Sequence, residues 1–196
     1  MKNNIVLTGV GGQGIVTAAN ILGKAAIKAN QNCFVSEVHG MAQRGGSVVC
    51  TVRIGDGVYG PLIENGTADA IISTEPIEAL RYIQYSNDNT KIIIDTNPVI
   101  PFTVSVGNDI YPNLNEVYSE LSKFGKLYKI DANKIATESG NIITKNIVLL
   151  GALASSKALI LDSEILLSTI LENFHPKFIE INKKAFQGGY ESIKNR

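Results

Sequence analysis

The sequence predicts a three-layer α/β fold with a Rossmann-like start, a mixed but mostly parallel sheet and a helical C-terminal third. Three observations lead to this prediction. Short apolar runs alternate with helical patterns as far as residue 131, a glycine-rich turn joins the first run to the first helical pattern, and the residues beyond 131 show helical patterns alone. The length of 196 residues suits one domain, spanning residues 1–196.

The first part of the chain predicts a βαβ unit. Residues 4–8 are a short apolar run that ends at a glycine cluster, which is typical of a buried strand. Residues 15–29 carry apolar side chains at helical spacing, and Asn30 supplies a C-terminal cap. Residues 33–38 form the second strand, which such a unit places parallel to the first through a right-handed crossover.

The next segment predicts strands of mixed direction. Residues 47–54 alternate in polarity and are rich in Val, so we expect a third strand. Gly55-Asp56-Gly57 is a tight turn, and residues 58–63 return as its antiparallel hairpin partner, although Gly60-Pro61 weakens this pairing. The sheet as a whole is therefore expected to be mixed.

Strands and helices alternate further along the chain before helices take over. Pro76 suits the first position of a helix, and Asn113 with Glu116 forms a capping box. The remaining predicted strands are 69–73, 91–95 and 127–131. The remaining predicted helices are 76–85, 113–124, 132–139, 144–161, 163–174 and 176–187, the last ending at Gly188-Gly189.

Composition excludes several classes of protein. The 18 Lys and Arg balance 18 Asp and Glu, and zero net charge argues against a dedicated nucleic-acid binder. The middle of the chain is net acidic and both ends are net basic. Solvated helix faces are the simpler explanation of the basic segments, and binding of an anionic ligand or partner is the alternative. Because no apolar run approaches the ~20 residues of a membrane span and no signal-peptide pattern is present, we expect a cytoplasmic protein without membrane contact.

The two cysteines limit the metal chemistry of the chain. Cys33 and Cys50 lie in strand-like stretches, so we expect reduced, buried thiols. An iron–sulfur cluster normally takes four thiolates, and a Cys-rich zinc site also needs more than two. We therefore expect the chain to hold no metal by itself.

The segment Gly9-Val10-Gly11-Gly12-Gln13-Gly14 matches the G-x-G-x-x-G fingerprint. It follows a predicted strand and opens a predicted helix, whose first N–H groups and positive dipole end attract anions. Glu37, at the end of the second predicted strand, stands where a carboxylate binds ribose in nicotinamide and flavin enzymes. Two explanations stay open: the loop binds a phosphate-bearing ligand, or its glycines only allow tight packing between strand and helix.

Residues 37–46 form a second loop with the densest polar chemistry in the chain. The loop contains His39, one of two histidines, and Arg44, one of four arginines, and it follows the second strand at the same sheet edge as the glycine loop. Arg44 suits a carboxylate or phosphate, and His39 can titrate or donate a hydrogen bond. An ordinary surface loop is the alternative.

The two loops, in this order and at this separation, resemble those of the gamma subunits or gamma domains of 2-oxoacid:ferredoxin oxidoreductases. The Met-Ala-Gln-Arg-Gly-Gly version of the second loop, residues 41–46, is most similar to the beta subunit of indolepyruvate:ferredoxin oxidoreductase. The similarity runs nearly end to end and includes residues 180–186 in the last predicted helix. The fingerprint alone would not be specific, whereas the pair of loops is.

The resemblance implies a division of labour between subunits. Enzymes of this family decarboxylate a 2-oxoacid oxidatively with coenzyme A and pass the electrons to ferredoxin. Thiamine diphosphate, Mg²⁺ and the iron–sulfur clusters would lie mainly on a large partner subunit, with none bound by this chain alone. The chain would complete the assembly and help to hold coenzyme A, and an aryl pyruvate such as indolepyruvate would be the substrate of the complex.

The expected site residues fall into two groups, and none is expected to be catalytic. The contact with phosphate, coenzyme A or a partner loop would involve Gly9, Gly11, Gly12, Gln13 and Gly14. The subunit interface near the active centre would involve Glu37, His39, Gly40, Met41, Gln43, Arg44 and Gly45.

Two other hypotheses stay open. The first is a free-standing NAD(P)- or FAD-binding Rossmann oxidoreductase with Glu37 on the ribose, although no catalytic acid or base is evident. The second is an assembly scaffold whose glycines only pack. Gly55-Asp56-Gly57 and Asn87-Asp88-Asn89 are similar to the two halves of a thiamine diphosphate motif, but a hairpin turn explains the first, so we expect no thiamine binding by this chain alone. Whether the isolated chain associates with itself is left open.

Overall fold

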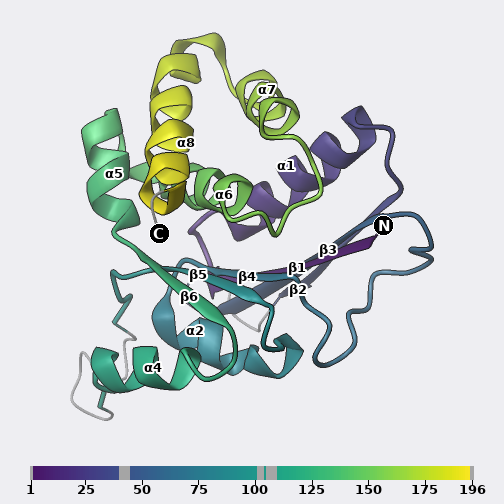
Figure 1. Ribbon diagram of the computed structural model, residues 1–196. Coiled ribbons are helices and arrows are strands. Elements are labelled where there is room, and N and C mark those ends of the chain that lie inside the picture. The colour runs from purple at the N-terminus through teal and green to yellow at the C-terminus, as the bar shows by residue number, and fades with distance from the viewer. Residues whose placement is uncertain (1, 40–44, 101–103, 105–109, 195–196) are drawn as a thin grey trace.

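A computed structural model of the chain describes residues 2–39, 45–100, 104 and 110–194. Figure 1 shows a central sheet between two layers of helices, which confirms the predicted three-layer α/β fold. The strands are β1 (Lys2–Val10), β2 (Cys33–His39), β3 (Ser47–Gly55), β4 (Ala70–Ser73), β5 (Lys91–Asp95) and β6 (Lys126–Ile130). The helices are α1 (Ile15–Lys28), α2 (Pro76–Arg81), α4 (Leu114–Leu121), α5 (Ala132–Ser139), α6 (Lys145–Ser155), α7 (Ser163–Asn173) and α8 (Ile179–Lys194). Short 3₁₀ turns are η1 (Ile83–Tyr85), η2 (Ile142–Thr144) and η3 (Pro176–Phe178).

The strand order is β2-β3-β1-β4-β5-β6. Strands β1, β4, β5 and β6 are parallel, while β3 runs antiparallel to both of its neighbours, β1 and β2. The predicted mixed, mostly parallel sheet is therefore confirmed. Strand β2 runs parallel to β1 as expected, but β3 lies between them.

The predicted hairpin partner at residues 58–63 is wrong, because these residues form no strand. Both edges of β3 are already taken by β1 and β2. The segment instead crosses one face of β3, where Arg53 Nη1 donates to the carbonyls of Gly60 (2.9 Å) and Leu62 (2.7 Å). Pro61 has no N–H group to give to a strand ladder, which agrees with this arrangement.

Helices α1, α5, α6, α7 and α8 cover one face of the sheet, and α2 and α4 cover the other (Figure 1). The larger core lies under the first group, where Ile5 and Leu7 of β1 are buried among the helices. Val6 of the same strand points to the opposite face and packs in a second cluster. Both faces of β1 are thus covered, as its uninterrupted apolar sequence predicts.

Helix α1 ends as the sequence predicts. Asn30 adopts a left-handed conformation with φ of 54°, and its N–H donates to the Ile27 carbonyl at 3.0 Å. The Gln31 N–H reaches back to the Ala26 carbonyl at 2.9 Å. This is a Schellman motif with Asn at the position that glycine usually takes.

The helix predicted at 144–161 is too long, since α6 ends at Ser155. The side chain of Asn3 explains the difference, because it binds the residues that follow. Asn3 Nδ2 donates to the Ala158 carbonyl at 2.7 Å, and the Ile160 N–H donates to Asn3 Oδ1 at 3.2 Å. A tertiary contact with β1 therefore holds this apolar segment outside the helix, and periodicity cannot reveal such a contact.

Gly188-Gly189 does not end the last helix, contrary to prediction, because α8 continues to Lys194. The crossing of α6 and α8 explains Gly189. A Cβ atom on Gly189 would lie 1.9 Å from the Val148 carbonyl oxygen, and one on Gly151 would lie 2.0 Å from that of Phe186. Only glycine allows the two backbones to approach this closely. None of the helices among the described residues has both the length and the apolar character needed to cross a membrane.

Candidate functional site

The glycine loop lies at the point in the sheet where the helix after one strand packs on one face and the helix after the next parallel strand packs on the other. Strand β1 leads into α1 on one face, and its parallel neighbour β4 leads into α2 on the other (Figure 1). In doubly wound α/β proteins, ligands bind in the crevice outside the carboxyl ends of two such strands. The loop therefore stands where the fingerprint predicts.

The side chain of Gln13 fills the crevice between β1 and β4. Its Oε1 accepts hydrogen bonds from the Val10 N–H at 3.0 Å and from Thr74 Oγ1 at 2.5 Å. A Cβ atom on Gly9 would lie 1.9 Å from Thr74 Oγ1, so glycine is required there for packing. The position that a pyrophosphate takes in a dinucleotide fold is occupied by protein atoms.

The other glycines of the loop have different roles. The N–H of Gly11 donates to the Gly46 carbonyl at 2.8 Å, which joins the glycine loop to the end of the second loop. Gly14 is left-handed with φ of 78°, and a Cβ atom there would lie 2.6 Å from Asn146 Nδ2. Gly12 has φ of 95° and nothing within 4 Å of its Cβ position. Of the loop glycines, Gly12 thus faces open space, while Gly9 and Gly14 serve close packing.

Glu37 does not occupy the position of a ribose-binding acid. It lies exposed on β2, opposite Cys50 of β3. Because β3 separates β2 from β1, Glu37 is two strand spacings, about 10 Å, from the strand that carries the glycine loop. In the dinucleotide fold that acid ends the strand next to the first.

The rest of the second loop is described only at its ends. His39 closes β2 in register with Val48, and Gly45 is exposed with φ of 78°. The residues Gly40, Met41, Gln43 and Arg44 lie outside the described residues. The contact of Gly11 with Gly46 places the second loop beside the glycine loop, as expected from the sheet edge that they share.

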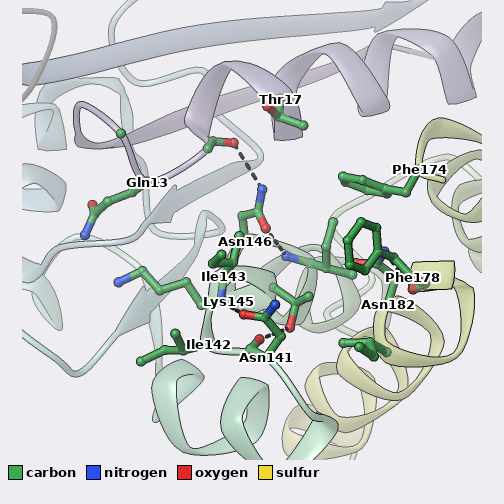
Figure 2. Close-up of a pocket in the computed structure, with 15 residues that line it drawn as sticks. Gln13, Thr17, Asn141, Ile142, Ile143, Lys145, Asn146, Phe174, Phe178 and Asn182 are labelled. Carbon is green, nitrogen blue, oxygen red and sulfur yellow. Dashed lines mark hydrogen bonds between the residues drawn. The ribbon is translucent and has the colours of Figure 1, made fainter.

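A cavity of about 440 Å³ lies between the glycine loop and the C-terminal helices. Figure 2 shows that α1, the start of α6 and the start of α8 surround it. Its polar lining includes Gln13, Thr17, Asn141, Lys145, Asn146 and Asn182. Its apolar lining is Ile142, Ile143, Ile147, Phe174, Phe178 and Ile181. A volume of this size suits part of a cofactor with an apolar or aromatic group.

Asn146 connects the cavity to the glycine loop. Its Nδ2 donates to the Gly14 carbonyl at 3.2 Å, as the dashed line in Figure 2 shows. Lys145 beside it extends away from Phe174 and Phe178 in the same view. Neither Lys145 nor Asn146 was predicted as a site residue. In the sequence they only begin an apolar helix, and the residues that they bind, Asp95 and Gly14, are more than 45 residues away.

A buried ion pair fixes Lys145. Its Nζ lies 2.9 Å from Asp95 Oδ2, and the side chain of Asp95 is fully buried while that of Lys145 is 13% exposed. Asp95 Oδ1 also accepts from the Asn97 side chain at 2.9 Å and from the Ala132 N–H at 3.2 Å. The carboxylate therefore joins the last residue of β5 to the first residues of α5 and α6, and of these Lys145 lines the cavity.

Two buried carboxylates lie on the other side of the crevice. Glu75 and Glu78 are 2% and 7% exposed. The Tyr111 hydroxyl donates to Glu75, and Ser47 Oγ donates to Glu78, which also pairs with Arg81 Nε at 3.2 Å. Because burial and then the bond to Glu75 raise the pKa of Tyr111, its hydroxyl stays a donor at neutral pH. Glu78 thereby anchors the first residue of β3, just beyond the second loop.

Neither cysteine has the environment of a reactive thiol. Both are free, Cys50 is buried and Cys33 is half-buried. Burial raises the pKa of Cys33, and burial with the nearby charge of Glu37 raises that of Cys50 to about 12. A reactive cysteine needs a lowered pKa instead.

The described residues do not fit the metal cofactors that the resemblance implies. Within them, no group of three His, Cys, Asp or Glu side chains is placed to hold a metal ion. Gly55-Asp56-Gly57 begins at the last residue of β3 and Asn87-Asp88-Asn89 precedes β5, and β1 and β4 lie between these two strands in the sheet. The Asn87 side chain is also engaged within its own turn, where Oδ1 accepts from the Asn89 N–H at 2.9 Å.

Comparison with known proteins identifies the family. The family described as pyruvate ferredoxin/flavodoxin oxidoreductase matches residues 4–192. The chain belongs to this family. An indolepyruvate oxidoreductase subunit IorB from Pyrococcus horikoshii is 47% identical over 97% of this chain and 96% of that protein. A pyruvate synthase subunit PorC from Methanothermobacter marburgensis is 32% identical over 95% of each chain.

Solved structures share the fold of this family member. The gamma subunit of a keto/oxoacid ferredoxin oxidoreductase from Geobacter sulfurreducens aligns with a TM-score of 0.74 and 23% identity over 99% of both chains. A pyruvate oxidoreductase subunit PORC from Thermotoga maritima gives 0.74 and 22% over 97% of this chain and 96% of that one. The expected resemblance to gamma subunits is confirmed, and the chain is an oxidoreductase subunit. The comparisons give no support to a free-standing NAD(P)- or FAD-binding enzyme.

Proposed function

We propose that the chain is the small subunit of an indolepyruvate-type 2-oxoacid:ferredoxin oxidoreductase. The gradient of identity among the relatives carries this proposal. Four archaeal proteins named indolepyruvate oxidoreductase subunit IorB are 39–47% identical to the chain. Subunits named for pyruvate or 2-oxoglutarate are 29–32% identical. An aryl pyruvate is therefore the favoured substrate of the complex.

The redox cofactors of such a complex belong to a larger partner subunit. Two cysteines are too few for a cluster held by four thiolates, and the thiols lie on the neighbouring strands β2 and β3. Thiamine diphosphate, Mg²⁺ and the iron–sulfur clusters would sit on the partner, which passes electrons to ferredoxin. This chain would complete the assembly within the cytoplasm.

The glycine loop and the adjoining cavity would contact coenzyme A. Open space beside Gly12 and the N-terminus of α1 suit a phosphate, while Phe174 and Phe178 suit an apolar or aromatic group. A 2-oxoglutarate:ferredoxin oxidoreductase from Magnetococcus marinus has been solved with coenzyme A bound. This chain aligns with 31% of that protein's length, at a TM-score of 0.76 and 21% identity.

The second loop would form the subunit interface near the active centre. Of its described members, Glu37 and His39 lie on β2, and Gly45 precedes Gly46, whose carbonyl the Gly11 N–H contacts. Gly40, Met41, Gln43 and Arg44 would complete the same surface. The hydrogen bond from Gly11 to Gly46 supports one continuous contact region made of both loops.

Reconstitution tests the proposed function. The co-expressed complex should reduce ferredoxin with indolepyruvate and coenzyme A, and should have a higher kcat/KM for indolepyruvate than for pyruvate or 2-oxoglutarate. Removal of this chain should abolish the reaction. If the partner subunit alone reduces ferredoxin at the full rate, the proposal fails.

Gly12→Ala tests the coenzyme A contact, and Gly57→Ala is its matched control. Both glycines have positive φ, of 95° and 75°, and open space at the Cβ position, so the backbone strain of the two variants is similar. We expect Gly12→Ala to raise the KM for coenzyme A in an intact complex and Gly57→Ala to leave it unchanged. Equal KM values in both variants would favour the scaffold hypothesis.

A further inference from the structure

The edge strand β2 carries two exposed apolar side chains. Among the described residues, β2 forms one edge of the sheet. Phe34 is 38% exposed and Val38 is 61% exposed, and both point to the same face because they are four residues apart on a strand. Long, apolar edge strands pair readily with other strands.

The backbone N–H and C=O groups of successive β2 residues point alternately toward β3 and toward the outer edge of the sheet. The Gly55 N–H donates to the Asn32 carbonyl at 2.8 Å, which fixes the phase of the antiparallel ladder between β2 and β3. The backbone groups of Phe34, Ser36 and Val38 therefore turn toward β3. Those of the odd-numbered residues of β2 turn toward the outer edge.

None of the helices that the structure describes lies beneath β2 and β3. Helices α2 and α4 lie under the other end of the sheet (Figure 1), and the segment 58–63 crosses β3 instead. Thr51 Oγ1 donates to the Pro61 carbonyl at 3.0 Å, on the face that Phe34 shares. Tyr59 and Leu62 of this segment are 90% and 80% exposed. The exposed apolar side chains thus extend from β2 onto this segment.

The two edges of the sheet differ in charge. Strand β6 contains two lysines among its five residues, Lys126 and Lys129. Lysines on an edge strand oppose pairing with another chain. Strand β2 has seven residues, of which Glu37 alone is an Asp, Glu, Lys or Arg. The sequence therefore protects β6 and leaves β2 suited to association.

We propose that two copies of this chain pair through antiparallel β2 strands around a twofold axis at Ser36. This register places Phe34 of each copy opposite Val38 of the other copy. It also places Glu37 of each copy opposite Val35 of the other, so the two Glu37 carboxylates do not face each other. The odd-numbered residues form the hydrogen-bonded pairs, in agreement with the phase of the ladder. Phe34 and Val38 fall in non-hydrogen-bonded pairs, where side chains approach most closely. The interface is isologous and closed, as in most homodimers.

Light scattering of the full chain tests the dimer. We expect a mass twice that of the 21.1 kDa chain at micromolar concentration. Phe34→Asp should give the monomer mass. Phe124→Asp is the matched control, since Phe124 is 37% exposed beside the opposite edge, and it should remain dimeric. Val38→Asp is a second disrupting variant, and circular dichroism checks that each variant is folded.

Disulfide trapping tests the register. Ser36 would face its own copy at a Cα separation of about 4.5 Å, within the disulfide range, so Ser36→Cys should cross-link under diamide. Val38→Cys is more exposed, but the two copies of residue 38 would lie about 14 Å apart, since four residue steps of ~3.4 Å separate them. It should not cross-link beyond the wild-type level.

Four results would overturn the proposal. The first is a monomeric wild-type chain, and the second is a dimer that Phe34→Asp leaves intact. The third is equal cross-linking of the Ser36→Cys and Val38→Cys variants. In the co-expressed complex, Ser36→Cys should cross-link two small subunits. The fourth overturning result is protection of this thiol by the partner subunit without a cross-link, because it would assign the β2 edge to the partner.

Discussion

The crossing of α6 and α8 can be tested with a single methyl group. In Gly189→Ala, the new Cβ atom would lie 1.9 Å from the Val148 carbonyl oxygen. Normal van der Waals separation is about 3.5 Å, so the helices must move apart by more than about 1.5 Å. A backbone carbonyl within a helix cannot rotate away as a side chain can. The strain must therefore spread through the buried contacts around Val148 and Phe186.

The expected loss of stability is the difference between two opposing effects. Overpacking a close contact costs ~1–3 kcal/mol, and a contact with backbone belongs at the upper end of this range. Alanine in place of glycine within a helix contributes about 0.5–1 kcal/mol of stabilisation. We expect Gly189→Ala to lower the free energy of unfolding by about 2 kcal/mol, which for a chain of this length lowers the Tm by roughly 4–8 °C.

Gly188→Ala supplies the control in the neighbouring residue. Its Cβ atom would lie 2.6 Å from Ile135 Cγ2, and the half-buried Ile135 side chain can move away through its χ1 torsion without a shift of a helix backbone. Both substitutions change helix propensity equally, so the difference between them isolates the backbone contact. Urea unfolding and thermal scans should place Gly188→Ala within about 0.5 kcal/mol of the wild type. If Gly189→Ala is as stable as Gly188→Ala, the explanation of Gly189 is wrong.

Three further predictions follow from buried or capped groups. Lys145→Met should lower the free energy of unfolding by about 3–5 kcal/mol, because it leaves the buried Asp95 carboxylate without its cation; urea unfolding measures this, and an unchanged stability would contradict it. Asp131→Ala should cost about 1 kcal/mol at pH 7 through loss of the α5 cap. The hydrogen bonds that Asp131 accepts lower its pKa from 3.8, so its contribution is present above about pH 4 and is lost as the pH falls through the folded pKa. The difference between wild type and variant should therefore shrink below pH 4, and a pH-independent difference would refute this linkage. Cys50 should resist Ellman's reagent in the native protein at pH 8, because a pKa of about 12 leaves roughly one thiol in ten thousand ionised, and it should react after unfolding. Equal reaction rates of Cys33 and Cys50 in the native protein would contradict this argument from burial.

Local patterns were sufficient to predict most of the fold. The apolar runs, the Asn30 cap and the Pro76 helix start are each determined by neighbouring residues, and the structure confirms them. The errors arose where a distant residue decides the outcome. Asn3 fixes the segment after α6, and Val148 explains Gly189. A single sequence cannot reveal such contacts.

The candidate site divides in the same way. The position of the two loops at one sheet edge follows from the strand and helix pattern, and the bond from Gly11 to Gly46 joins them. Lys145 and Asn146 were missed because their partners, Asp95 and Gly14, are 50 and 132 residues away. The ribose-binding position that the alternative hypothesis gave to Glu37 is ruled out because β3, which follows it in the chain, inserts between β2 and β1.

The same glycine fingerprint can thus serve two different designs. In a dinucleotide fold, the crevice beyond the first strand stays open for pyrophosphate, and the acid of the next strand lies beside it. Here Gln13 closes the crevice through Val10 and Thr74, and β3 moves the acidic strand away. The space that remains lies above the loop, where Gly12 and Asn146 meet the C-terminal helices. A loop that serves mainly to pack, with one open glycine beside a cavity, fits a subunit that contributes one wall of a composite site better than an enzyme that binds a whole dinucleotide alone.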